Sequence, residues 1–216
     1  MSSKNTHQDK EAVVMIHGLW LNGMDMSLLK KRMIAAGYYV KRFSYQSLTA
    51  SPDENARTLQ SFINELGYSH IHFVCHSLGG LVVRHLFNRY PDQKPGKVVT
   101  LGTPHNASQA ARQFYSLPFG GLMLGQSITH GLLGSAPPWT GSHSLGSIAG
   151  TLRLGLGMIM PGIPRPNDGT VAVSETQLDG MVDHVTVDAS HFGLLLSKKV
   201  AEHSIQFIKN GQFNCG

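Results

Sequence analysis

The sequence predicts a single α/β domain built on a mostly parallel sheet. Short apolar runs of strand length alternate with segments of helical periodicity over residues 12–101, and this alternation is typical of βαβ units. The chain has 216 residues, of which 41% are hydrophobic and 14% charged, so it can fill one core and is not a disordered chain. We therefore expect one domain over residues 1–216, with about six strands flanked by helices.

Each expected element of the first half has its own local signal. Ser51 is a helix N-cap, and it is followed by a proline at the first helical position and by two acids. Gly37 and Gly67 stand where glycines end helices. The expected elements are, in order, strand 12–16, helix 24–36, strand 38–45, helix 52–66, strand 71–75, the helix that Pro91 ends, and strand 97–101.

The regular alternation stops between Gly102 and Pro166. Residues 105–143 are rich in Leu, Met and aromatic side chains but poor in charge, so we interpret them as a cap-like insertion over one end of the sheet. An apolar segment of this length must bury its side chains against the sheet end, a ligand or a partner. The remaining expected elements are strand 145–149, strand 183–187 and a final helix over 192–208.

Composition excludes several classes of protein. The net charge of +5 is spread along the chain, whereas a nucleic-acid surface needs clustered cations, so we expect no nucleic-acid partner. Cys75 in a buried strand and Cys215 near the last residue do not suggest a disulfide, which indicates a reducing compartment. The first ten residues are polar, unlike a secretion signal, and no apolar run is long enough to span a bilayer. We therefore expect a cytoplasmic protein.

The segment 71–80 is the most informative part of the chain. A buried strand runs into Ser77 and from there directly into a helix, as in a nucleophile elbow, where a sharp turn raises a serine hydroxyl above a parallel sheet. The turn requires small residues on both sides, and here these are Cys75 and Gly79. The usual pattern is G-x-S-x-G, so Cys75 is a departure that its small size permits. The alternative is that Ser77 only caps the following helix.

A serine hydroxyl becomes a nucleophile only with a base and an orienting acid, which follow the elbow in the order acid, then histidine. We choose His191, between the last strand and the last helix, over His184, which lies inside a strand; the alternative for His191 is a surface position at a helix start. We choose Asp168 as the acid, although an aspartate in such a turn commonly caps its own backbone. The competitors for the role of acid are Asp179, Asp183 and Asp188.

The negative charge that develops on a substrate oxygen during acyl transfer needs backbone N–H donors. One is expected from Leu78, which follows the nucleophile at the N-terminal end of its helix. The other is expected from Leu19 in the loop after the first strand, where Gly18 lets the backbone approach closely. We interpret His17 as a residue that holds this loop in place.

Five motifs span nearly the whole chain in this order: His17-Gly18-Leu19, Cys75-His76-Ser77-Leu78-Gly79-Gly80, Gly102-Thr103-Pro104-His105, Asn167-Asp168-Gly169-Thr170-Val171 and His191-Phe192-Gly193. Together they make the chain resemble the α/β-hydrolase superfamily, and within it the bacterial lipase and esterase branch that includes PGAP1-like proteins. The resemblance implies a triad of Ser77, Asp168 and His191, with no cofactor and no metal. It also implies a minimal α/β-hydrolase fold, because the strands that usually precede the first one are missing.

These inferences favour a serine hydrolase that cleaves small-molecule carboxylic esters with an apolar acyl group through an acyl-enzyme intermediate. The insertion over 105–143 would line or cover the acyl pocket, so Leu122 and Leu124 are expected to set the preferred chain length. One alternative is an acyltransferase that uses the same triad with an acceptor other than water. Another is a non-catalytic protein that binds an acyl ligand or a partner.

Overall fold

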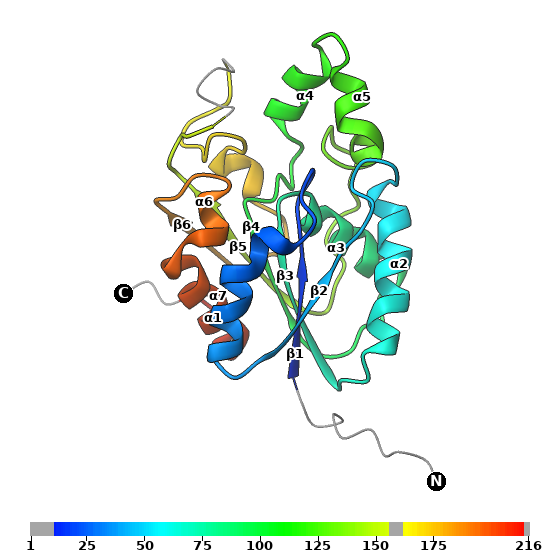
Figure 1. The fold of residues 1–216 in the computed structure, drawn as a ribbon, viewed down its shortest axis with the longest axis vertical. Helices are drawn as coiled ribbons and strands as arrows, with labels where there is room; N and C mark the ends of the chain where they lie inside the picture. Colours follow the sequence, from blue (N-terminus) through cyan, green and yellow to red (C-terminus); the bar gives the residue numbers. More distant parts are fainter. Residues whose placement is uncertain (1–10, 156–161, 214–216) are drawn as a thin grey trace.

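The computed structural model describes residues 11–155 and 162–213, which form a six-stranded sheet with helices on both faces (Figure 1). All neighbouring strands are parallel, in the order β2-β1-β3-β4-β5-β6. This confirms the α/β architecture and the parallel sheet expected from the sequence. The strands are β1 Glu11–Ile16, β2 Tyr39–Phe43, β3 His70–His76, β4 Lys97–Leu101, β5 Ser144–Gly150 and β6 Asp183–Val187.

Helices bury their apolar sides against the two faces of the sheet (Figure 1). One core cluster contains Met33 and Phe207, and the other contains Leu59 and Phe73. Burial of such large side chains on both faces is what a parallel sheet requires. The first face is covered by α1 Ser27–Ala35, α6 Gly193–Leu196 and α7 Lys198–Asn210, and the second face by α2 Pro52–Glu65 and α3 Leu78–Arg89.

Two expected helices differ from the structure in detail. The residues expected to begin a helix at Met24 form a 3-10 turn, η1 Met24–Met26, and α1 starts after it. The final helix expected over 192–208 is divided into α6 and α7. The division occurs because Ser197 is extended and its hydroxyl accepts a hydrogen bond from the Val200 N–H, which begins a new helix.

The stretch 105–143 lies between β4 and β5, and its residues 109–128 rise above the carboxyl edge of the sheet, where Figure 1 shows them in green. It contains α4 Gln109–Tyr115, α5 Gly120–Leu124 and the 3-10 turn η2 Gly125–Ile128. Buried Arg84 of α3 joins two separate points of the stretch, because its guanidinium donates to the carbonyl oxygens of His105 at 2.6 Å and of Pro137 at 2.8 Å. The stretch is therefore anchored to α3 at its first residue and again after η2.

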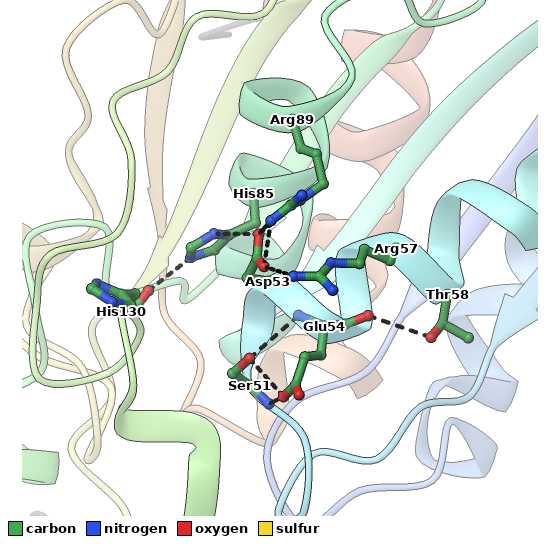
Figure 2. A network of polar contacts seen from close by, with 8 residues as sticks. All are labelled: Ser51, Asp53, Glu54, Arg57, Thr58, His85, Arg89 and His130. Atoms are coloured by element: carbon green, nitrogen blue, oxygen red, sulfur yellow. Dashed lines mark hydrogen bonds and ion pairs between the residues drawn. The ribbon is translucent and has the colours of Figure 1, made fainter.

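A polar network fixes a turn of the same stretch to α2 and α3 (Figure 2). Asp53 of α2 accepts hydrogen bonds from Arg57 and from Arg89 of α3, the shortest at 2.7 Å. His85 lies beside Asp53, and its Nε2 donates to the carbonyl oxygen of His130 at 2.8 Å. Asp53 and Arg89 thus join α2 to α3, and the hydrogen bond from His85 to His130 joins α3 to the stretch 105–143.

The expectation that the apolar side chains of this stretch are buried is met only in part. Leu124 and Leu132 are buried in a small cluster beneath α5. Phe119 and Leu122, in contrast, are 78% and 81% exposed, so they are not buried against the sheet end. The physical reason is the shortness of α5: a helix of little more than one turn can direct only one side toward the sheet. No helix among the described residues has the length and apolarity to cross a bilayer.

Candidate active site

Ser77 occupies the tight turn between β3 and α3. Its backbone has φ 52° and ψ −121°, a conformation that non-glycine residues rarely adopt and that costs about 1–3 kcal/mol. Neighbouring strands hold it there: the Ser77 N–H donates to the Leu101 carbonyl at 2.9 Å, and Thr103 Oγ1 donates to the Ser77 carbonyl at 2.8 Å. The backbone of a nucleophile elbow is strained in this way.

The small residues around Ser77 are required by close packing. A Cβ atom on Gly79 would lie 2.6 Å from the carbonyl oxygen of Ile16 and 2.7 Å from that of His17, which real Cβ atoms do not approach so closely. Cys75 on the other side is fully buried, and burial raises the pKa of its thiol. The helix after Ser77 therefore packs directly on the end of β1, which explains why small residues stand here.

His191 and Asp168 come together from two loops on the carboxyl side of the sheet. Asp168 is fully buried, and its Oδ2 lies 2.7 Å from His191 Nδ1, so the Nδ1–H donates to the carboxylate. The His191 N–H also donates to the Asp168 carbonyl at 2.8 Å. This pairing leaves Nε2 of a neutral imidazole without a proton, so it can act as a base.

Asp168 can both cap its own turn and orient His191, because its two carboxylate oxygens have different hydrogen-bond partners. Oδ1 accepts hydrogen bonds from the Thr170 N–H at 2.9 Å and the Val171 N–H at 2.7 Å, so it caps the turn. Oδ2 remains for His191. The turn therefore orients the carboxylate that orients the histidine.

The alternative candidates for the acid and the base are either exposed or make other contacts. Asp179 and Asp188 are exposed, and Asp183 accepts a hydrogen bond from the Phe213 N–H at 2.6 Å. His184 lies in β6, where its Nε2 is 2.9 Å from Thr176 Oγ1. Across the hydrogen bonds and ion pairs of the described residues, none of these four contacts His191.

Ser77 and His191 line one cavity of about 410 Å³. The hydrogen bonds of residues 11–155 and 162–213 do not include one from Ser77 Oγ to His191 Nε2, a contact that is often longer in enzymes without substrate. Leu122, expected to shape the pocket, is not among the lining residues and faces outward, so that expectation is wrong. The apolar lining includes Leu19, Trp20, Phe114, Leu124, Leu132 and Leu154.

The two residues expected to supply the oxyanion donors lie on either side of Ser77. Leu78 is the first residue of α3, where a helix has unpaired N–H groups and a positive dipole end. Leu19 lines the cavity, and the loop before it passes close to the nucleophile: a Cβ on Gly18 would lie 3.0 Å from Ser77 Cβ. Neither the Leu19 nor the Leu78 N–H donates a turn or loop hydrogen bond within the described chain.

His17 lies under this loop in a set of contacts that agrees with the role we gave it. It is fully buried, its ring stacks on Tyr45 at 4.3 Å, and the Tyr45 hydroxyl donates to the His17 carbonyl at 2.8 Å. Its Nδ1–H donates to the Gly18 carbonyl at 2.8 Å, and its Nε2 accepts from the Tyr45 N–H. Burial lowers the pKa of His17, which matches this neutral pattern.

His76 supports the His191 loop, a role that the sequence analysis did not assign. Its Nε2–H donates to the His191 carbonyl at 3.0 Å, and the two rings lie 4.7 Å apart. Burial and the neighbouring His191 hold the pKa of His76 well below its usual range, so the ring is neutral. A residue inside an elbow strand gives no local signal of such a distant contact.

Glu175 is a second residue that the sequence analysis did not single out. Its buried carboxylate accepts hydrogen bonds from the Gln109 N–H, at the start of α4, and from the Ala172 N–H, at 2.7 and 2.9 Å. Burial raises the pKa of this carboxyl group. Glu175 thus connects α4 to the turn that carries Asp168. No three His, Cys, Asp or Glu side chains of the described residues are placed to hold a metal ion.

The chain has the α/β-hydrolase fold that the sequence analysis expects. The mature Bacillus licheniformis lipase BlEst2 superposes with a TM-score of 0.70 at 19% identity, over 89% of this chain and 90% of that chain. A metagenomic carboxyl esterase gives 0.65 at 17% identity, over 84% of this chain and 64% of that chain. A bromoperoxidase from Bacillus anthracis gives 0.64 at 15% identity, over 94% of both chains.

Comparisons of the sequence give no relative of known function. The model of a family described as a domain of unknown function, DUF7379, matches residues 3–115. No curated protein matches the sequence significantly. The matched part contains the first four strands, Ser77 and both expected oxyanion residues, but neither Asp168 nor His191.

Proposed function

Because the chain belongs to the DUF7379 family, a domain of unknown function, we propose its activity from the site itself: it hydrolyses carboxylic esters with Ser77 as nucleophile, His191 as base and Asp168 as orienting acid. The observation that carries this proposal is the 2.7 Å hydrogen bond between Asp168 and His191 beside a cavity that Ser77 also lines. The bond fixes the tautomer whose Nε2 can take a proton. Similarity to a lipase and to a carboxyl esterase agrees with this class of reaction.

In the first half of the proposed reaction, Ser77 forms an acyl-enzyme. His191 Nε2 removes the hydroxyl proton as the Ser77 oxygen attacks the ester carbonyl carbon. Negative charge then develops on the carbonyl oxygen, and we assign its stabilisation to the N–H groups of Leu19 and Leu78. Collapse of the intermediate breaks the bond to the alkoxy oxygen, which leaves as the alcohol with the proton from His191.

In the second half, water releases the acid. His191 Nε2 takes a proton from water, and the water oxygen attacks the acyl carbon on Ser77. Collapse of this intermediate releases the carboxylic acid and returns the proton to Ser77. Asp168 stabilises the imidazolium in both halves without taking the proton itself.

The lining of the cavity favours esters with an apolar acyl group. Phe114, Leu124 and Leu132, all from the stretch 105–143, lie on it. Apolar side chains contribute to binding by removing substrate CH₂ groups from water, at about 0.8 kcal/mol each. We therefore propose that this stretch acts as a cap that holds the acyl chain, and that the protein belongs to the lipase and esterase branch.

Cys75, buried and unpaired, supports our placement of the protein in the cytoplasm.

The test is hydrolysis of p-nitrophenyl esters from short to long acyl chains, with Ser77→Ala as the variant. The loss of the nucleophile should lower kcat by about 10⁶, as in triad enzymes generally, while thermal unfolding stays unchanged because one hydroxyl is removed. A fluorophosphonate probe should label the wild type at Ser77. Free acid, not an alkyl ester, should form when an alcohol is added. A Ser77→Ala variant that keeps a tenth of the activity, or a wild type that resists the probe, would refute the proposal.

A further inference from the structure

The segment with α4 and α5 stands beyond the carboxyl edge of the sheet, at the top of Figure 1, and it carries a group of exposed apolar side chains. We call this group the apolar tip. Phe119 and Leu122 are the most exposed members. Trp20 joins it from the loop after β1, since its Nε1–H donates to the Met123 carbonyl at 3.0 Å. The apolar tip comprises Trp20, Tyr115, Leu117, Phe119, Leu122 and Met123, each about half exposed or more.

The apolar tip adjoins the catalytic cavity that we propose. Trp20 lines this cavity with one part of its ring while it is 48% exposed overall. In α5, Leu124 is buried on the cavity side, whereas Leu122 and Met123 face outward. A molecule that covered the apolar tip would therefore lie next to the space where an acyl chain binds.

The stretch of sequence that carries most of the apolar tip has no exposed acid. The sequence has no Asp, Glu, Lys or Arg between residues 113 and 152. Asp168 and Glu175 are the acids between residues 102 and 176, and both are buried. Arg112 and Arg165 in the same interval are exposed. Exposed apolar side chains on a stretch whose exposed charges are arginines match a surface that is negative at its boundary and apolar below it.

We propose that the apolar tip inserts into the surface of an anionic phospholipid bilayer and holds the cavity mouth against it. A bilayer accepts single projecting side chains such as Phe119 without a matching pocket, whereas a protein partner must provide a complementary one. The segment below is fixed to the fold by His85 and Arg84 (Figure 2 shows the contact of His85 with His130), so the side chains are held outward. This contact does not rest on ester hydrolysis, because it needs no chemistry at Ser77.

The experiment measures vesicle binding by the full chain carrying Ser77→Ala, so that no lipid is consumed. Sedimentation with vesicles of phosphatidylcholine and phosphatidylglycerol should give clear binding, weaker by about 5-fold for each arginine removed in Arg112→Gln and Arg165→Gln. Trp20 and Trp139 are the two tryptophans, and Trp139 packs on Phe87 at 4.8 Å. A Trp139→Phe variant thus makes Trp20 the reporter, and its emission should shift to shorter wavelength with vesicles.

Two matched double variants distinguish binding through the apolar tip from nonspecific adsorption of exposed apolar side chains. Phe119→Ser with Leu122→Ser should weaken binding by at least about 10-fold, because both side chains leave water on insertion. Leu28→Ser with Ile34→Ser, on exposed positions of α1, should change it less than 2-fold, a margin we set against the scatter of about 0.5 kcal/mol for neutral surface changes. Equal loss in both pairs, no binding to any vesicle, or self-association through the apolar tip in ultracentrifugation without vesicle binding overturns the proposal. A wild-type protein that hydrolyses no ester, together with a Ser77→Ala variant that binds vesicles, would overturn only the proposed hydrolysis.

Discussion

Residues 11–101 and residues 102–191 build the candidate site in different ways. The first part alternates strands and helices, and its turn between β3 and α3 places Ser77. The second part is mostly irregular, yet it supplies Asp168, His191 and much of the cavity wall. A nucleophile elbow is a local structure that neighbouring residues specify, whereas an acid–histidine pair is a contact between loops distant in sequence. Local sequence is therefore enough to place the candidate nucleophile, but not the pair of residues that would activate it.

After the loss of the nucleophile itself, the largest effect should come from the second part. Asp168→Asn is expected to lower kcat by about 10³–10⁴, because the amide group would face His191 Nδ1 and favour the wrong tautomer. The fold should survive, since the amide oxygen can still accept from the Thr170 and Val171 N–H groups. Ester hydrolysis and thermal unfolding of Asp168→Asn check this. Asp188→Asn, at an exposed position, is the matched control, and a larger loss there than at position 168 would reverse the assignment.

The contact between the two parts should show a smaller effect. His76→Phe keeps a ring of similar size but cannot donate to the His191 carbonyl, so the base loses one anchor. We expect kcat to fall about 10-fold, the scale of one neutral hydrogen bond of about 1–1.5 kcal/mol, while KM changes little. His76→Gln, whose side-chain amide can donate, should recover part of the rate. Equal loss in both variants would contradict a role of His76 through this hydrogen bond.

Within the second part, the two sides of α5 should differ. Leu124→Ala enlarges the cavity, and we expect the best p-nitrophenyl ester to be longer by about two CH₂ groups, each worth about 0.8 kcal/mol. Leu122→Ala, at an exposed position outside the cavity, should leave the profile of soluble esters unchanged. Rates across the acyl series decide this, with thermal unfolding as the control for folding. A shift in the Leu122→Ala variant would contradict the structure.

A last effect, on stability and not on activity, concerns pH and His105, where the second part begins. Burial, with Arg84 and His184 nearby, lowers the pKa of His105 from 6.5 to about 3. Between these values the unfolded chain binds a proton that the folded chain does not, so stability falls as pH falls below 6.5. The slope from this group is at most about 1.4 kcal/mol per pH unit.

Urea unfolding at pH 7, 6 and 5, choices that span the upper part of this window, measures the slope. His105→Asn removes the titrating group, so its free energy of unfolding should depend less steeply on pH than that of the wild type, whatever its value at pH 7. His130→Asn, at an exposed position, serves as the control and should keep the wild-type slope. An unchanged slope in His105→Asn would contradict the lowered pKa.

Local signals in the sequence were enough to predict the alternating strands and helices, the parallel sheet and the turn that carries Ser77. These follow from signals within a few residues, such as the cap at Ser51, whose hydroxyl does accept from the Glu54 N–H, and the small residues around the elbow. The sequence also favoured Asp168 as the acid, and the resemblance to α/β-hydrolases reinforced that choice. The alternative role, capping its own turn, is present as well, in the Thr170 and Val171 contacts.

Only the tertiary structure decided which oxygen of Asp168 meets His191, that His76 holds the His191 loop, and that Leu122 faces outward while Leu124 faces the cavity. Each of these depends on a partner far away in sequence or on which side of a single helical turn meets the sheet. Periodicity over so short a segment does not fix that side, and apolar composition alone does not say what the side chain will be buried against.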